Sequence, residues 1–212
     1  MMNKTNKKQI YPLIKRLLDV VLSVVALLLI WPVMLVVAIA VAWDRGPVFY
    51  AQQRVGRDGK PFRVYKFRSM KPGAERLEDF LSPEELAEYR KEYKLVKDPR
   101  VSKVGNILRK TSLDELPQLV NIIKGDMSLV GPRPLLESEL KGNYTPEQRQ
   151  KLLSVRPGLT GYWQAVSRNE SSYITGERQQ QELYYIGRVS FLMDFKIVCM
   201  TVKRVFSRKG AV

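Results

Sequence analysis

Histidine is absent from this chain, and cysteine occurs only once, as Cys199. The lack of histidine excludes Ser/His and Cys/His nucleophile systems, zinc sites with imidazole ligands and an imidazole general base. The single cysteine excludes an intrachain disulfide, and its apolar neighbours predict an inert buried thiol in a reducing compartment. Any catalytic base must therefore be Asp, Glu, Lys or Tyr.

Glycine-rich nucleotide motifs are missing as well. The 13 glycines form no Gly-x-Gly and no Gly-Lys-Ser/Thr, which argues against dinucleotide fingerprints and Walker-type phosphate loops. The 212 residues, 45% of them hydrophobic, suit one globular domain plus an appendage. The formal net charge of +15 attracts nucleic acid, an anionic membrane or phosphorylated substrates, and charge alone does not choose between them.

An apolar run decides in favour of the membrane. Val20 to Trp43 carries no charge, and a helix of that length would be roughly 36 Å long, enough to cross a hydrocarbon core of ~30 Å. Pro32 inside the run predicts a kink or break. Bases flank both ends, so the positive-inside rule places both ends in the cytoplasm. These bases are Lys4, Lys7, Lys8, Lys15 and Arg16 before the run, and Arg45, Arg54, Arg57 and Lys60 after it. We therefore expect a re-entrant membrane helix in residues 1–43, in preference to a spanning one, and a globular domain on the cytoplasmic face in residues 44–212.

Arg16 and Asp19 mark the start of this helix at i, i+3 spacing. A carboxylate at the centre of a bilayer would cost about 2.5 to 3.5 kcal/mol. Asp19 is therefore expected at headgroup depth, paired with Arg16 or a base further along the chain. An ordinary interfacial charge pair explains the spacing equally well.

The globular part reads as α+β and mostly helical. Val48 to Gln53 and Phe62 to Phe67 predict a small hairpin around an Asp-Gly turn. Capping patterns open helices at Ser82 and Thr145, and Ser102 and Gly125 bracket two more short helices. Near the C-terminus, apolar residues recur at helical intervals between charges. We expect an amphipathic helix lying in the membrane interface there, with an internal core helix as the alternative. The apolar positions are Phe191, Leu192, Phe195, Val198, Cys199, Val202, Val205 and Phe206.

The acidic pair Asp114-Glu115 stands within the otherwise basic stretch 109–119. One interpretation is structural, because carboxylates favour helix N-termini: Ser112 with Glu115 could form a capping box, or Asp114 could cap a helix with Pro117 in its first turn. The other is chemical, because a helix end also collects anions, so a diphosphate could dock beside a nucleophilic Asp114. The residues alone favour the cap, since caps are far commoner than nucleophiles.

Several motifs keep their order along the chain around this pair. They are Lys66 to Met70 (KFRSM), Lys124 to Pro134 (KGDMSLVGPRP) and Arg156 to Gln164 (RPGLTGYWQ). Together with Lys15 to Asp19 (KRLLD) they resemble the bacterial sugar transferases, most closely the small monotopic phosphoglycosyl transferases. The likeness runs from about Lys15 to Arg204 and reverses the preference at Asp114 from cap to nucleophile. Many relatives have Ser-Pro at the helix kink, whereas this chain has Trp31-Pro32.

The resemblance implies an enzyme of the bacterial inner membrane, monotopic and facing the cytoplasm. It would move a sugar 1-phosphate from a UDP-sugar to polyprenyl (undecaprenyl) phosphate, release UMP and so begin glycan assembly. Asp114 would form an aspartyl phosphosugar, and Glu115 would hold a metal-bound water, orient the acceptor or simply cap a helix. Because a carboxylate must approach a diphosphate and no histidine is available, oxygen-bound Mg²⁺ on Asp114 is the expected cofactor.

Four bases fall in the matching motifs and are the expected phosphate contacts: Lys66, Arg109, Arg133 and Arg156. Without the motifs, each would be interpreted as a solvated base on a strongly basic chain. The polar stretch from Arg168 to Gln181 could contact the sugar or form a solvated loop. The expected partners are the two substrates and membrane lipids, with a homodimer as an option and no nucleic acid. Two other functions stay open: a non-catalytic basic module that binds lipid or nucleic acid, and a nucleotide-sugar hydrolase.

Overall fold

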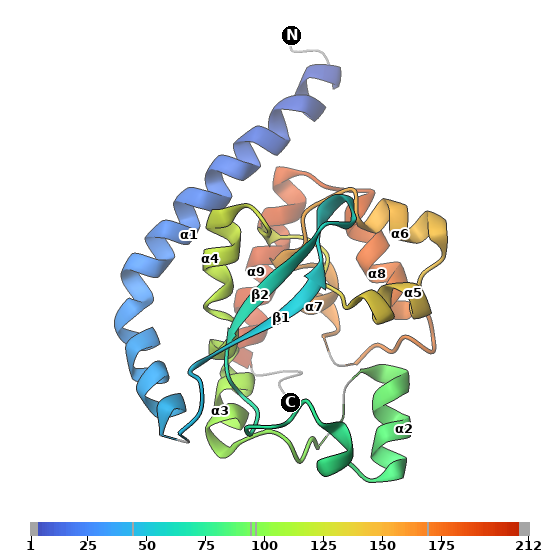
Figure 1. Ribbon diagram of the computed structural model, residues 1–212. Helices are drawn as coiled ribbons and strands as arrows, with labels where there is room; N and C mark the ends of the chain where they lie inside the picture. The colour runs from blue at the N-terminus through green and yellow to red at the C-terminus, as the bar shows by residue number, and fades with distance from the viewer. Residues whose placement is uncertain (1–3, 44, 94, 96, 169, 208–212) are drawn as a thin grey trace.

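The first helix dominates the shape of the molecule. The computed structural model describes residues 4–43, 45–93, 95, 97–168 and 170–207. Helix α1 spans Lys4–Ala42 and lies along one side of the globular part, bending on its way (Figure 1). It continues unbroken through Pro32, so the alternative of a break there is wrong, and a kink at this residue stays a prediction. Its Tyr11–Ala42 segment is long and apolar enough to cross a membrane.

The expected pairing of Arg16 with Asp19 is wrong. The Arg16 guanidinium donates instead to the carbonyls of Ile122 and Ile123, at 2.6 and 2.9 Å. Asp19 is buried and accepts from Ser128 Oγ at 2.8 Å and from the Leu129 amide at 3.0 Å. The spacing misled because both side chains turn toward the globular part, where Arg16 meets carbonyls at the end of α4 and Asp19 meets donors of Ser128 and Leu129.

The predicted hairpin is confirmed. Strands β1 (Phe49–Val55) and β2 (Pro61–Phe67) pair antiparallel, with Val55 opposite Pro61. A single 3-10 turn, Arg57–Gly59, joins them, with Asp58 at φ 58° and Gly59 at φ 77°. An Asp-Gly sequence suits this turn because both residue types tolerate the left-handed region.

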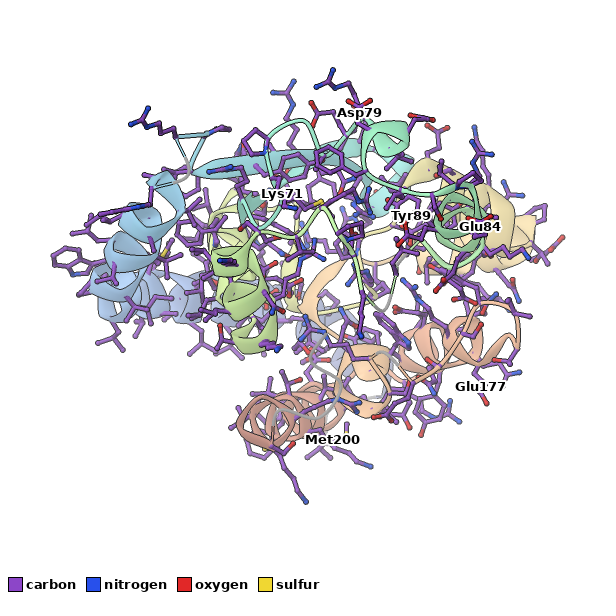
Figure 2. All side chains as sticks on the ribbon, turned by 90° about the horizontal axis from the view of Figure 1, so that it is seen from below. Lys71, Asp79, Glu84, Tyr89, Glu177 and Met200 are labelled. Atoms are coloured by element: carbon purple, nitrogen blue, oxygen red, sulfur yellow. The ribbon has the colours of Figure 1, made fainter. Side chains whose placement is uncertain are left out.

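The capping patterns at Ser82 and Thr145 are also confirmed. Each forms a complete capping box, opening α2 (Pro83–Glu92) and α6 (Pro146–Leu152). Helix α2 belongs to an excursion whose two ends meet at a bridge between Met70 and Val101. Figure 2 shows Tyr89 on the side of α2 that faces the rest of the molecule, where its ring lies 4.6 Å from the Arg100 guanidinium.

Ser102 and Gly125 bracket two helices as expected. Ser102 caps α3 (Lys103–Thr111), and Gly125, at φ 98°, ends α4 (Gln118–Lys124). A 3-10 turn, Leu113–Glu115, connects the two helices and carries the acidic pair. Strand β2 packs against this turn, and α1 packs against α3 and α4 on either side of it, which fixes the position of the acidic pair.

A second small sheet escaped the sequence analysis. Strands β3 (Ser128–Val130) and β4 (Gly158–Thr160) pair in parallel. At Gly131 an added Cβ would lie 2.4 Å from the Arg156 carbonyl oxygen, so only glycine allows this approach. The pairing places the segment after β3, which carries Arg133, beside the segment after β4, which leads to Trp163.

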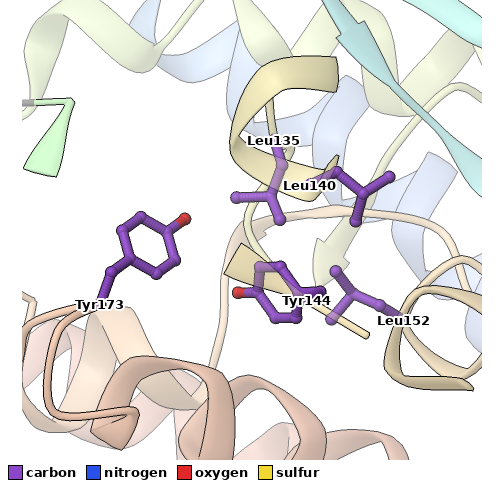
Figure 3. Close-up of a cluster of buried hydrophobic side chains, with 5 residues drawn as sticks. All are labelled: Leu135, Leu140, Tyr144, Leu152 and Tyr173. Carbon is purple, nitrogen blue, oxygen red and sulfur yellow. The ribbon is translucent and has the colours of Figure 1, made fainter. Parts of the chain in front are cut away.

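The remaining helices complete the core around this sheet. They are α5 (Glu137–Asn143), α7 (Tyr162–Val166), α8 (Glu177–Ile186) and α9 (Phe191–Ser207). Figure 3 shows one of the buried clusters, in which the rings of Tyr144 and Tyr173 meet edge to face with centroids 6.2 Å apart. This cluster closes the end of the molecule formed by α5 and α6.

Helix α9 is amphipathic, as expected. Ile197 is fully buried, whereas Phe191, Leu192 and Phe195 are exposed. The helix forms one edge of the molecule in Figure 2, where Met200 is labelled. Cys199 lies on the exposed side, so the prediction of a buried thiol is wrong: its apolar neighbours along the helix are themselves exposed. The location of α9 in a membrane interface stays a prediction.

Candidate active site

Asp114 does not cap a helix. Helix α3 ends at Thr111, and Ser112 follows it with a left-handed backbone at φ 58° and an Oγ that accepts from Arg168 at 2.8 Å. Helix α4 follows Pro117, and no side chain caps it. Both proposed capping registers are therefore wrong, because the left-handed turn at Ser112 sets the direction of the chain before α4 begins. Asp114 is left 5% exposed, and within the described residues its Oδ1 accepts no hydrogen bond.

Glu115, by contrast, is firmly paired. Its Oε1 lies 3.0 Å from Nζ of Lys66, which reaches it from β2. The side chains of Lys66 and Glu115 are 26% and 19% exposed, so solvent screens this ion pair only partly. The pair links the hairpin to the turn that carries the acidic residues.

The pKa values of the two carboxyl groups are shifted in opposite directions. Burial raises the pKa of Asp114, Lys66 acts against this, and the charge of Glu115 adds to the increase. Burial would also raise the pKa of Glu115, but Lys66, Arg168 and Arg133 together lower it to about 2. Adjacent acids held at different pKa values are typical of sites in which each has a separate role.

Four bases surround the pair. The positive charges of Lys66, Arg109 and Arg168 lower the pKa of Asp114. Arg133 acts on Glu115 in the same way, together with Lys66 and Arg168. Arg109 is oriented by a hydrogen bond from its Nε to Ser69 Oγ, at 3.1 Å. Bases gathered around the pair in this way suit an anionic ligand.

Arg168 joins this group, although its polar stretch predicts only a sugar contact or a solvated loop and no phosphate contact. A sequence signal did exist, because Arg168 follows the Arg156–Gln164 motif by four residues. The motif forms β4 and the start of α7, so the chain leaving α7 returns toward Ser112.

The structure separates Arg156 from the group. Its Nε donates to the Gly125 carbonyl at 2.9 Å, at the opposite end of α4 from Asp114. Burial lowers the pKa of Arg156, and the nearby charges of Arg57 and Arg16 lower it further. Arg156 and Arg16 therefore both bind carbonyls at the C-terminal end of α4, where bases stabilise a helix. Of the four predicted phosphate contacts, Lys66, Arg109 and Arg133 lie around the acidic pair.

The donor set around Asp114 fits Mg²⁺ shared with a substrate. No cluster of three or more metal-ligating side chains of the His, Cys, Asp or Glu type occurs in the described part of the chain. A bare carboxylate oxygen does occur, on Asp114, beside a second carboxylate. Mg²⁺ is usually held by one or two carboxylates, its other ligands being water and substrate phosphates. These residues could hold such an ion only together with a phosphate ligand.

The chain belongs to the bacterial sugar transferase family, whose model matches residues 10–208. It is 43% identical to the undecaprenyl-phosphate galactose phosphotransferase of Salmonella typhimurium over 93% of its length, covering 41% of that protein. It is 44% identical to the exopolysaccharide production protein ExoY of Rhizobium meliloti over 93% of its length, covering 87% of that protein. It is 39% identical to the UDP-glucose:undecaprenyl-phosphate glucose-1-phosphate transferase of Escherichia coli over 94% of its length, covering 41% of that protein. The chain thus spans less than half of two of these relatives and most of the third.

Proposed function

We propose that this protein transfers a sugar 1-phosphate from a UDP-sugar to polyprenyl phosphate. The observation that carries the proposal is the buried carboxylate of Asp114, which lies among bases and has one oxygen without a hydrogen-bond partner in the described part of the chain. Relatives named as undecaprenyl-phosphate sugar phosphotransferases support the two substrate classes. Since their names specify different sugars, galactose and glucose, the proposal is made for UDP-sugars as a class.

In the proposed reaction, an oxygen of Asp114 attacks the sugar-linked phosphorus of the UDP-sugar. The bond from that phosphorus to the bridging oxygen breaks, and UMP leaves with the electron pair. An oxygen of polyprenyl phosphate then attacks the same phosphorus, giving polyprenyl diphosphate sugar and restoring the carboxylate. Dividing the transfer into two steps means that the two anionic substrates need not be held together.

The surrounding bases explain how a carboxylate can approach a diphosphate. The positive charges of these bases offset the negative charges of the diphosphate, and arginine suits bidentate phosphate contacts. When bound, Mg²⁺ would supply further positive charge at Asp114 and the phosphate oxygens. Glu115 keeps Lys66 beside Asp114 through their ion pair, which gives the second carboxylate a positioning role.

The acceptor dependence of UMP release tests this function. Purified protein incubated with UDP-sugar and Mg²⁺ should release at most one UMP per protein molecule, because the aspartyl intermediate then has no acceptor. Adding polyprenyl phosphate should give sustained release and a lipid-linked sugar product. Sustained release without the lipid would instead show a hydrolase. No release under either condition, with tight binding to anionic vesicles, would show a non-catalytic module.

We further propose that α1 enters and leaves the membrane on the cytoplasmic side. Near its start, Lys15 lies 2.6 Å from Asp194 of α9, and near its end Val37 and Val41 pack in a core cluster with Phe67. These points are roughly 39 Å apart along the helix axis, yet both contact the same globular part. A helix crossing the bilayer would carry one of its ends away from that part. The outward side chains between them are apolar and exposed, as expected for contact with lipid.

Cysteine labelling distinguishes the two topologies. In a Cys199→Ala background, single cysteines are introduced as Lys4→Cys and, on exposed α2, Glu84→Cys. A membrane-impermeant maleimide applied to spheroplasts should label neither position until the membrane is opened. Labelling of residue 4 from outside, with residue 84 protected, would establish a spanning helix and overturn the re-entrant topology.

A further inference from the structure

We infer that Glu182 is a positioning residue that fixes Arg133 in the active site through the Arg133 backbone amide. This inference rests on the proposed function. Glu182 lies on α8, is 1% exposed, and belongs to none of the motifs that the sequence analysis singled out. Its two carboxylate oxygens lie 3.3 and 3.2 Å from the Arg133 nitrogen.

The Pro132-Arg133-Pro134 segment makes this contact unusually selective. Proline has no backbone N–H, so the Arg133 amide is the only main-chain donor in the three residues. Glu182 accepts from that donor with both oxygens, and the prolines limit how the segment can rotate around it. The carboxylate therefore holds this segment at its single amide, while the Pro132 carbonyl accepts separately from the Gly158 amide at 2.8 Å.

Aromatic rings and a second arginine complete the arrangement. Arg178 is 4% exposed, and its guanidinium lies 4.1 Å from the Trp163 ring and 4.0 Å from the Tyr173 ring. The Arg133 guanidinium faces the same Trp163 ring at 5.6 Å. Burial raises the pKa of Glu182 to about 7, while the charge of Arg178 and the Arg133 amide act in the opposite direction. Arg178 thus favours the charged form of Glu182 that binds the Arg133 amide.

Glu182 faces two groups, the buried charge of Arg178 and the Arg133 amide, and the second is the one that needs explaining. A backbone amide needs a single acceptor, and a main-chain carbonyl would serve without the cost of burying a charge. A buried carboxylate is a costly choice for that purpose. Its position makes sense if the orientation of Arg133 matters, because Arg133 is one of the bases acting on Glu115. Small displacements of groups that bind a reacting phosphate reduce rates strongly.

A double-mutant cycle tests the inference. The variants are Glu182→Gln, which keeps the shape but removes the charge and one acceptor, and Arg133→Ala, alone and combined. Glu182→Gln should lower kcat/KM for the UDP-sugar roughly 10-fold, the scale of a hydrogen bond to a charged group, mainly through KM. In the Arg133→Ala background, Glu182→Gln should lower kcat/KM by less than about 2-fold, because the side chain that it positions has been removed.

Asp194→Asn is the matched control. Asp194, on α9, is also buried and accepts from the hydroxyl of Tyr185, which lies on α8 with Glu182, at 2.8 Å. No hydrogen bond joins Asp194 to the Arg133 amide within the described residues. Asp194→Asn should change kcat/KM by the same factor in the unmutated protein and in the Arg133→Ala variant. If Glu182→Gln lowers kcat/KM by the same factor in both backgrounds, the inference is overturned. It is also overturned if a lower melting temperature explains the loss of activity. If the unmutated protein releases no UMP in this assay, the proposed function itself has failed, which is a separate result.

Discussion

Replacing Asp114 with Asn should lower UMP release by roughly 10³-fold or more, because an amide cannot serve as the phosphorus nucleophile. The same change should not destabilise the protein. Asp114 Oδ1 accepts no hydrogen bond within the described residues, and burial raises the pKa of this group. When folding raises the pKa of a carboxyl group, the protein becomes less stable as the pH rises through that pKa. Ionised Asp114 therefore destabilises the folded protein at neutral pH. Asn removes this cost.

The measurement is paired: UMP release with both substrates, and the melting temperature in the same detergent. Asp126→Asn is the control, since Asp126 lies beyond the far end of α4 and accepts from Asn121 Nδ2 at 3.3 Å. It should keep activity within about 3-fold of the unmutated protein, the range usual for a site away from catalytic groups. Retention of more than a tenth of the activity in Asp114→Asn would reject the nucleophile assignment. A large drop in its melting temperature would show that the carboxylate has a structural role.

Replacing Lys66 with Met should have the second largest effect, a rate reduction of roughly 100-fold at neutral pH. Lys66 opposes the effect of burial on the pKa of Asp114 and is the first of the bases that lower the pKa of Glu115. Without it both pKa values rise, so at a given pH less Asp114 is ionised. The acid limb of the kcat/KM profile, which reports the ionisation of Asp114, should therefore move to higher pH.

The test compares the dependence of kcat/KM on pH in the Lys66→Met and Lys124→Met variants. Lys124 is a useful control because it also contacts β2, its Nζ lying 3.1 Å from the Tyr65 hydroxyl, yet it is absent from the acidic site. Lys124→Met should leave the acid limb in place and change the rate less than about 3-fold. An acid limb that does not move in Lys66→Met would contradict the assignment of that limb to Asp114.

Local chemistry in the sequence was enough to predict much of the fold. The hairpin was predictable because Asp58 and Gly59 suit a left-handed turn between two β-rich runs. The boundaries at Ser82, Ser102 and Gly125 followed from hydrogen-bonding rules that depend on nearby residues only. The parallel pairing of β3 with β4 was not predictable in this way. Each strand has three residues, too few for a period, and their contact depends on segments far apart in the chain.

The candidate site shows the same division. The acidic pair and Lys66, Arg109 and Arg133 could be selected from motifs, and the structure brings them together. The capping interpretation of Asp114 failed because it assumed that α4 begins at the pair, whereas a left-handed residue ends α3 first. Arg156 and Arg168 were misjudged because both lie near β4, and only the three-dimensional path shows which one returns to Asp114.

The central claim is a covalent bond between Asp114 and phosphorus, and mass spectrometry of the quenched enzyme tests it most directly. Protein mixed with UDP-sugar and Mg²⁺ without acceptor is quenched in acid within one turnover and digested with trypsin. Cleavage after Lys110 and Lys124 isolates both acidic residues in one peptide, residues 111–124. The account predicts that this peptide gains the mass of one sugar phosphate, located on Asp114 by fragmentation and removed when polyprenyl phosphate is added before quenching. An unmodified peptide, while lipid-linked product still forms in parallel reactions, would contradict it.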